Sequence, residues 1–335
     1  MPHLTRQYSI DPSKRHLLGL GAAALAMHWV PTVWAQDAAA SNLQDEVWTD
    51  KARSRDLPTL LRWPTGLDGS VKGVILFSHG MGGNRQGADV WGQAWAAAGF
   101  CVVHLQHPGS DAPAMKGGFS ALRKAMAPEQ LLARVADVKF VMDEIQRRHD
   151  QKQARWDEVP VKKLGFAGHS FGARTAQALA GQAYPNGGGW QGTEPRLAAF
   201  AMFSPALGKT PQLPQATADA RSMTRPTLVI TGTLDGEVLN NGETPETRRM
   251  VYDCLPAGKK ALLLIKGADH LTFAGVAKQI PSTILLRREA PTMQAEAQHH
   301  DRIAKISTQW WKTQLLGAAL PDPLALATGD IWLKG

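Results

Sequence analysis

Cysteine is almost absent from this chain, which contains only Cys101 and Cys254 among its 335 residues. Two cysteines cannot build the disulfide framework that stabilises small secreted domains. In an oxidising compartment the two could pair. Cys101, however, begins an apolar segment and Cys254 lies in a helix-like one, so two separate buried thiols are an equally good interpretation. Neither thiol has the basic surroundings that would make it a nucleophile.

The chain also lacks a long apolar run and a dense cluster of one charge. The apolar stretch at residues 17–27 is shorter than the roughly 20 residues that a membrane-spanning helix needs. The formal net charge is +8, but lysine and arginine are scattered along the sequence. Nucleic-acid-binding proteins usually concentrate these residues in a stripe. We therefore expect no nucleic-acid partner and no stable membrane insertion of the mature chain.

Phosphate-binding and metal-binding motifs are missing as well. Neither a Walker-type loop nor a complete G-x-G-x-x-G motif occurs. His104 and His107 have a metal-like spacing, but they straddle the end of a predicted strand and no third ligand is nearby. His299 and His300 fall within a predicted helix. We expect neither a metal site nor a cofactor.

The first 35 residues are predicted to form a secretory signal peptide. Arg6, Lys14 and Arg15 precede the apolar residues 17–27, and a small-residue cleavage site ends at Ala35. This pattern indicates export of the mature chain to the periplasm or to the medium of a bacterium. The Sec and twin-arginine routes both stay open.

Continuous apolar segments alternate with amphipathic ones along the rest of the chain. The apolar segments have the length of strands and lie at residues 72–80, 100–105, 163–168, 197–203, 227–232 and 261–266. Helical patterns lie at residues 128–150, 243–255 and 294–316. Continuously apolar strands are typical of a mostly parallel central sheet with helices on both faces. We therefore predict one α/β domain over residues 36–335, with its chemistry at the carboxyl ends of the strands.

Other segments carry weaker signals. Residues 36–45 are predicted to form a flexible leader, and residues 47–64 two antiparallel edge strands that turn near Asp56. Residues 108–127 are rich in glycine, proline and alanine, so we expect an irregular excursion over the carboxyl edge of the sheet. No pattern is evident in the last 19 residues, after Leu316.

The stretch Gly168-His169-Ser170-Phe171-Gly172 lies between a predicted strand and a predicted helix. It matches the G-x-S-x-G nucleophile elbow, in which a serine sits on a sharp strand-to-helix turn with its hydroxyl exposed. Side chains two residues before and after the serine would crowd this turn, which explains the glycines. The helix that follows directs its N–H groups and positive dipole end toward the space beside Ser170. For the motif alone, a serine N-cap would be an equally simple explanation.

A candidate acid and a candidate base follow later strands. Asp235 comes after the strand at residues 227–232, and His270 after the strand at residues 261–266. Serine is a poor nucleophile unless a base removes its proton, and a histidine held by a carboxylate suits that task. The order Ser170, Asp235, His270 is that of α/β-hydrolases. Each residue alone could be an ordinary loop residue, so the combination is what predicts a catalytic triad.

Two other carboxylates, Glu237 and Asp269, compete for the role of the acid. Asp269 is adjacent to His270, and the side chains of neighbouring loop residues usually diverge. Asp235 is therefore the preferred acid. No carboxylate closely follows the strand at residues 197–203, the other place where an acid could stand.

An oxyanion needs N–H donors as well. The glycine-rich loop after the strand at residues 72–80 is one expected source, and the residue after the nucleophile is the other. We assign the backbone N–H groups of Met81 and Phe171 to this role. Large aromatic side chains that could line an acyl pocket, although each could equally belong to the core, are Trp91, Trp95, Phe119 and Trp190.

These motifs resemble the branch of the α/β-hydrolase superfamily that contains predicted dienelactone hydrolases and platelet-activating-factor acetylhydrolase-like esterases. The resemblance covers roughly residues 45–311. The motifs on which it rests are R-S-R-D-L-P, F-S-H-G-M-G-G, V-V-H-L-Q-H-P-G-S-D, G-H-S-F-G-A, R-P-T-L-V-I-T-G-T-L-D and A-D-H-L-T-F. It implies a serine esterase that acts on a small-molecule or lipid-like ester, with Ser170, Asp235 and His270 as triad and Met81 and Phe171 as oxyanion donors.

The sequence departs from the proteins it resembles at two positions. Dienelactone hydrolases use a cysteine nucleophile, and this chain has Ser170 there, so lactone specificity does not carry over. Met81 stands where cutinase-like polyester hydrolases have an aromatic residue, which weakens the case for a polyester substrate. An acyltransferase with the same triad and a non-catalytic binding protein on the same fold also stay open. The oligomeric state is not predicted.

Overall fold

The computed structural model describes most of the chain beyond its N-terminal segment. The described residues are 42–64, 70–184, 190–207, 212–236, 242–278, 288–320 and 326–335. The predicted signal peptide, residues 1–35, lies outside them. Within the described ranges no helix is long and apolar enough to cross a bilayer.

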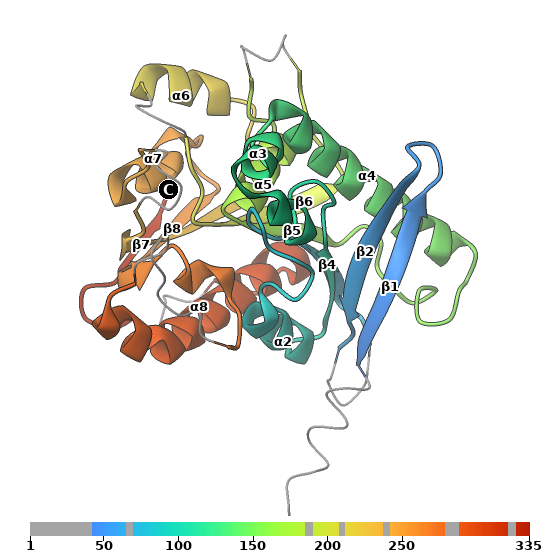
Figure 1. The fold of residues 1–335 in the computed structure, drawn as a ribbon. Coiled ribbons are helices and arrows are strands. Elements are labelled where there is room, and N and C mark those ends of the chain that lie inside the picture. Colours follow the sequence, from blue (N-terminus) through green and yellow to red (C-terminus); the bar gives the residue numbers. More distant parts are fainter. Residues whose placement is uncertain are drawn as a thin grey trace, which may run out of the picture.

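One mostly parallel sheet runs through the molecule (Figure 1). The described strands form it in the order β1-β2-β4-β3-β5-β6-β7-β8-β9. Its parallel strands are β3 (Gly73–Ser78), β4 (Phe100–Leu105), β5 (Leu164–His169), β6 (Leu197–Phe203), β7 (Thr227–Leu234) and β8 (Lys260–Asp269). Every residue of β3, β4 and β5 is buried, as expected for strands covered on both faces. The predicted α/β fold class is confirmed.

Antiparallel strands close both edges of the sheet. Strands β1 (Leu43–Asp50) and β2 (Arg55–Arg62) form a hairpin, and β2 pairs antiparallel with β4. The predicted turn near Asp56 is wrong, because the chain reverses over residues 51–54. Asp50 determines this position: its carboxylate accepts the N–H groups of Ala52 and Arg53 and thus closes the turn.

Three other segments differ from the prediction. The leader predicted over residues 36–45 is wrong from Leu43 onward, where β1 begins. The segment predicted to be irregular contains a 3₁₀ turn, Pro113–Gly117, and helix α3, Gly118–Ala125. A strand with no visible sequence pattern, β9 (Ile331–Lys334), pairs antiparallel with β8. Its four residues are too few to show a periodicity.

Helices cover both faces of the sheet (Figure 1). Helices α2 (Asp89–Ala97) and α8 (Ala290–Leu316) lie on one face. The other face carries α4 (Pro128–Asp150), α5 (Phe171–Ala180) and α7 (Pro245–Cys254), and α6 (Leu213–Ala220) packs on α7. The two hydrophobic cores therefore lie one on each side of the sheet.

Most of the aromatic residues considered for an acyl pocket belong elsewhere. Trp91 and Trp95 are fully buried in the core between α2, α8 and the sheet. Trp190 packs against Tyr184 and the opposite core. The side chain of Phe119 lies outside the described part of the structure.

Cys101 and Cys254 are both buried and unpaired. They lie in β4 and at the end of α7. Burial raises the pKa of the Cys101 thiol to about 12. Both cysteines behave as small core residues rather than as reactive groups.

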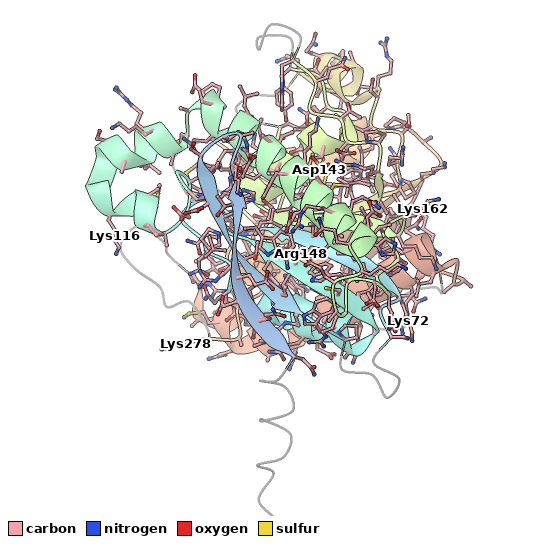
Figure 2. The ribbon with its side chains drawn as sticks, turned by 90° about the vertical axis from the view of Figure 1, so that its right-hand side faces the viewer. Lys72, Lys116, Asp143, Arg148, Lys162 and Lys278 are labelled. Atoms are coloured by element: carbon pink, nitrogen blue, oxygen red, sulfur yellow. The ribbon has the colours of Figure 1, made fainter. Side chains whose placement is uncertain are left out.

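Helix α4 is attached to the edge hairpin through Arg148 (Figure 2). The guanidinium group pairs with Glu46 of β1 at 2.8 Å and lies 4.4 Å from the centre of the Trp48 ring. Trp156 packs edge-on against Trp48. This contact fixes α4 along the antiparallel end of the sheet, and α4 in turn carries residues that reach the site.

Candidate active site

The turn predicted to be a nucleophile elbow lies where β5 ends and α5 begins. Ser170 stands alone between these two elements, with φ 53° and ψ −112°. Its N–H donates to the carbonyl oxygen of Phe203 at 3.0 Å. A non-glycine residue in this region of backbone space typically costs about 1–3 kcal/mol, and such strain is concentrated at functional sites.

Close packing explains the two glycines of the motif. A Cβ atom on Gly172 would overlap the carbonyl oxygen of Ser78, and one on Gly168 would overlap the backbone of Gly172. The helix can therefore start directly behind the strand only if both positions lack a side chain. This arrangement holds the Ser170 hydroxyl at the carboxyl edge of the sheet.

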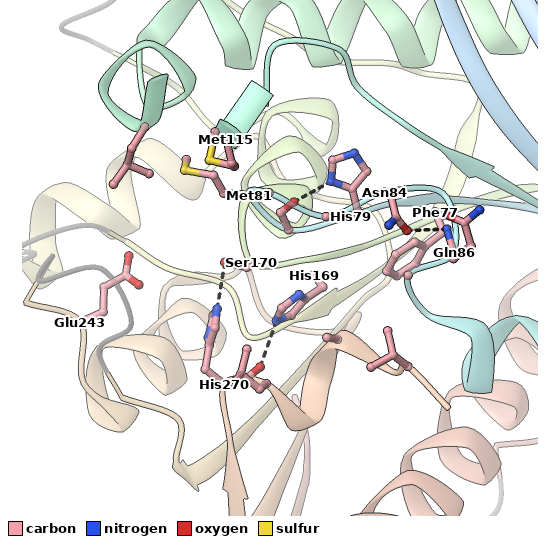
Figure 3. A pocket seen from close by; sticks show the side chains of 18 of the residues that line it. Phe77, His79, Met81, Asn84, Gln86, Met115, His169, Ser170, Glu243 and His270 are labelled. Atoms are coloured by element: carbon pink, nitrogen blue, oxygen red, sulfur yellow. Dashed lines mark hydrogen bonds between the residues drawn. The ribbon is translucent and has the colours of Figure 1, made fainter. Parts of the chain in front are cut away.

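The structure brings together the three residues predicted as a triad. His270 Nε2 lies 3.0 Å from Ser170 Oγ, and His270 Nδ1 lies 3.0 Å from Asp235 Oδ1. Figure 3 shows the Ser170–His270 hydrogen bond at the rim of a pocket. The residues follow β5, β7 and β8, whose carboxyl ends meet at one edge because the strands are parallel.

Asp235 is fully buried and held by several donors. Arg248 Nε lies 2.8 Å from its Oδ1, and the Thr231 hydroxyl donates to its Oδ2 at 2.7 Å. Burial alone would raise the pKa of this carboxyl, but the charge of Arg248 and the hydrogen bonds from His270 and Thr231 hold the pKa below its ordinary value. The group is therefore a carboxylate that faces His270.

A serine that carries no sequence signal joins this chain of contacts. Ser204 follows β6, has φ 51°, and is fully buried. Its hydroxyl donates to Asp235 Oδ1 at 2.8 Å, and its Oγ lies 2.7 Å from His270 Nδ1. Sequence reasoning missed this residue, because the segment after β6 was searched only for a carboxylate and a single serine there belongs to no motif.

The rival acid Asp269 has a different role. Arg288 Nε donates to its Oδ2 at 2.7 Å, and the N–H of Thr272 donates to its Oδ1 at 2.9 Å. Asp269 therefore shapes the turn that carries His270. The other rival, Glu237, lies outside the described residues.

The loop that follows β3 lies beside Ser170. A Cβ atom on Gly80 would come within 3.4 Å of Ser170 Cβ, and the N–H of Gly82 donates to the carbonyl oxygen of Ser110 at 2.9 Å. For the N–H groups of Met81 and Phe171, the described part of the chain offers no hydrogen-bond acceptor. Both remain available to an oxygen atom placed beside Ser170.

Comparison with solved structures identifies the architecture. The structure resembles the crystal structure of a dienelactone hydrolase from Anabaena variabilis, with a TM-score of 0.50 and 17% sequence identity. The match covers 82% of this chain and 99% of the other. The chain has the α/β-hydrolase fold. No protein-family model matches the sequence, and no curated protein does.

Two buried histidines support the loops at the carboxyl edge of the sheet. The Nε2–H of His169 donates to the carbonyl oxygen of His270 at 3.1 Å, and burial lowers the pKa of His169 to about 3. The Nδ1–H of His79 donates to the carbonyl oxygen of Gly80 at 2.6 Å, while its Nε2 accepts the N–H of His107. Both rings are neutral and hold loops in place (Figure 3).

A cavity of about 470 Å³ opens at Ser170 and His270. Met81 and Met115 lie on one side of it, and Glu243 lies on another (Figure 3). Its further apolar lining comes from Phe77, Leu122, Leu271, Ala274 and Val276. Glu243 pairs with Arg248 at 2.7 Å, which connects the cavity wall to the partner of Asp235. A mostly apolar cavity with a few polar groups is typical of a site for a small molecule.

The histidines with metal-like spacing have separate partners. His104 Nδ1 donates to the carbonyl oxygen of Gly87 at 3.0 Å, whereas His107 Nδ1 lies 2.9 Å from Asp137. Among the described residues no group of three or more histidine, cysteine, aspartate or glutamate side chains could hold a metal ion.

Proposed function

We propose that this protein is a serine carboxylic-ester hydrolase that works through an acyl-enzyme. The observation that carries the proposal is the continuous hydrogen-bonded chain Ser170–His270–Asp235, which ends in a hydroxyl at the rim of a cavity. A serine, a base and a buried carboxylate in this geometry are the parts that nucleophilic acyl transfer requires.

In the proposed reaction, Ser170 Oγ attacks the ester carbonyl carbon while His270 Nε2 accepts the hydroxyl proton. The carbonyl oxygen becomes an oxyanion, which accepts hydrogen bonds from the N–H groups of Met81 and Phe171. His270 then protonates the departing alcohol, and a water molecule activated by the same nitrogen releases the acid. Asp235 keeps the proton on Nδ1 and stabilises the imidazolium.

The volume and the apolar lining of the cavity favour a substrate with a compact acyl group. Met81, Met115 and Leu122 offer apolar surface next to Ser170, and about 470 Å³ is enough for a short or medium chain. We propose a small-molecule or lipid-like ester as the substrate.

Export is a second part of the proposal. Its support is the order of basic residues, apolar residues and a small-residue cleavage site in the first 35 residues. When a bacterial host expresses the full-length chain, the protein recovered from the periplasm or medium should have an N-terminus near Gln36, as determined by mass spectrometry. Cytoplasmic protein that keeps its first 35 residues would contradict export.

Hydrolysis of p-nitrophenyl esters, from acetate to long acyl chains, tests the function. Wild type should turn over the shorter members, and Ser170→Ala should lower kcat by at least about 10³-fold, because the variant lacks the hydroxyl that forms the acyl-enzyme. Ser307→Ala is the matched control, since Ser307 is a buried serine of α8 that contacts Trp95. This control should keep wild-type rates. A wild type that is inert across the series, or a Ser170→Ala variant that retains its activity, would overturn the proposal.

A further inference from the structure

A buried arginine lies beneath the loop that carries Met81. Arg134 of α4 is fully buried, and its Nη1 donates to the carbonyl oxygen of His79 at 2.7 Å. Its Nε donates to the Ser110 hydroxyl at 2.9 Å. Ser110 in turn accepts the N–H of Gly82 through its carbonyl oxygen, so the guanidinium group holds the loop directly at His79 and through Ser110 at Gly82.

The same guanidinium group also contacts the other half of the site. Its central carbon lies 4.3 Å from the centre of the Phe171 ring, a distance at which a cation is attracted to an aromatic face. Phe171 is the first residue of α5 and follows Ser170 directly. Arg134 thus bridges the two segments whose N–H groups are available beside Ser170.

We propose that Arg134 is a positioning residue, which holds the N–H groups of Met81 and Phe171 at the separation that a developing oxyanion requires. This inference rests on the proposed ester hydrolysis. A hydrogen bond to the carbonyl oxygen of His79 fixes a peptide plane two residues before Met81. The contact with the Phe171 ring fixes the start of α5. An error of about 1 Å in such a geometry can lower a rate by about 10²-fold.

Arg134 carries a buried positive charge whose nearest carboxylates already have other partners. Burial lowers its pKa to about 9, so the guanidinium group is still protonated at neutral pH. The carboxylates that attract it most, Asp137 and Asp111, are engaged by other groups: Asp137 pairs with Arg55, and Asp111 accepts from Gln106. Among the described residues Arg134 has no ion-pair partner, and a buried charge without one reduces stability.

The neighbourhood of Arg134 also explains the R-S-R-D-L-P stretch, residues 53–58, whose two arginines contact α4. Asp137 lies three residues after Arg134 and is fully buried on the same side of α4. Arg53, Arg55 and His107 all bond to its carboxylate. His107 Nε2 in turn lies 2.6 Å from Ser78 Oγ, at the end of β3. This second serine–histidine–aspartate chain is closed to substrate, and it supports the base of the same loop.

The rates of an oxoester and of the matching thionoester can be compared. This comparison distinguishes a loss of oxyanion-donor positioning from a general loss of protein stability. N–H groups bind a developing oxyanion much more strongly than a developing thiolate, so wild type should hydrolyse an oxoester faster than the matching thionoester. In Arg134→Met the oxoester kcat should fall by about 10²-fold with little change in KM, because the donors act in the transition state. The oxoester-to-thionoester rate ratio should fall by about tenfold or more.

Two further variants control this experiment. Arg62→Met removes another buried arginine, which pairs with Asp89 away from the cavity, and should leave the rate ratio unchanged while lowering stability. Phe171→Leu keeps the N–H group but removes the ring, and should lower the ratio as Arg134→Met does. If Arg134→Met does not fold, Phe171→Leu still tests whether the contact between these two side chains positions the oxyanion donors.

The outcomes are distinct for the two proposals. An active wild type together with a folded Arg134→Met that keeps the wild-type rate ratio would overturn the positioning role. The same holds if Phe171→Leu leaves the ratio unchanged. A wild type that hydrolyses neither ester would instead overturn the proposed function.

Discussion

Replacing Asp235 with asparagine is expected to lower kcat for ester hydrolysis by about 10⁴-fold. The carboxylate accepts a hydrogen bond from the Nδ1–H of His270, which leaves Nε2 free to accept the proton of Ser170. An asparagine amide can turn its NH₂ group toward the ring, which favours the opposite tautomer and removes the charge that stabilises the imidazolium. KM should change little, because Asp235 is buried and does not line the cavity.

Asp269→Asn is the matched comparison, since it changes the carboxylate adjacent to His270. It removes an anion that is held by Arg288, so it should lower the melting temperature but keep kcat within about tenfold. Steady-state kinetics and thermal unfolding of both variants give the answer. If Asp269→Asn lost as much activity as Asp235→Asn, or if Asp235→Asn kept wild-type kcat, the assigned acid would be wrong.

The free energy of unfolding is expected to fall steeply as the pH drops from about 6.5 to about 4. Burial lowers the pKa of His104 to about 3, of His107 to about 4 and of His169 to about 3. An unfolded histidine titrates near ~6.5. Between these values the unfolded chain binds protons that the folded chain does not, so acid favours unfolding. Each histidine contributes about 1.4 kcal/mol per pH unit.

Two buried carboxylates extend this loss of stability to lower pH. Hydrogen bonds and nearby positive charges hold the pKa of Asp137 and of Asp235 below the ordinary value, against the effect of burial. Their contribution is complete above the unfolded pKa of about 3.9 and is lost as the pH falls through the folded values. The histidines therefore determine most of the pH dependence of the free energy of unfolding above pH ~4, and the carboxylates determine most of it below that pH.

Denaturant unfolding at several pH values between 7.5 and 4.5 (roughly the window of unfolded-histidine titration) measures this dependence. A native domain has about 5–15 kcal/mol of stability, so the combined effect of the buried histidines should unfold it near the acid end of this pH range. His104→Gln should reduce the slope by at most about a quarter, because burial also lowers the pKa of His79, His107 and His169. A wild-type free energy of unfolding that stays constant from pH 7 to pH 5 (about 1.5 units into the window) would contradict the buried-histidine account.

The local patterns of the sequence were sufficient to predict the fold class and the parallel strands of the sheet. The helix predicted at residues 128–150 coincides with α4, and the strand predicted at residues 197–203 coincides with β6. Both segments are long and strongly periodic or continuously apolar, so local propensity and tertiary packing agree. The positions of Ser170, Asp235 and His270 could be predicted because each directly follows such a strand.

The supporting residues of the site could not be predicted in this way. Ser204 is 66 residues from His270, and Arg134 is 55 residues from His79. Each acts through a contact between elements that meet only in the folded chain, and neither belongs to a motif. The same reason applies to β9, whose four residues become a strand because β8 offers them a partner.

Labelling with a fluorophosphonate tests the central claim most directly, because the reagent forms a stable bond only with a serine that a neighbouring base activates. Peptide mass spectrometry of the labelled protein should find one adduct per chain, located on Ser170, and Ser170→Ala should remain unlabelled. Absence of an adduct on the folded wild type, or an adduct on a different serine, would contradict the account.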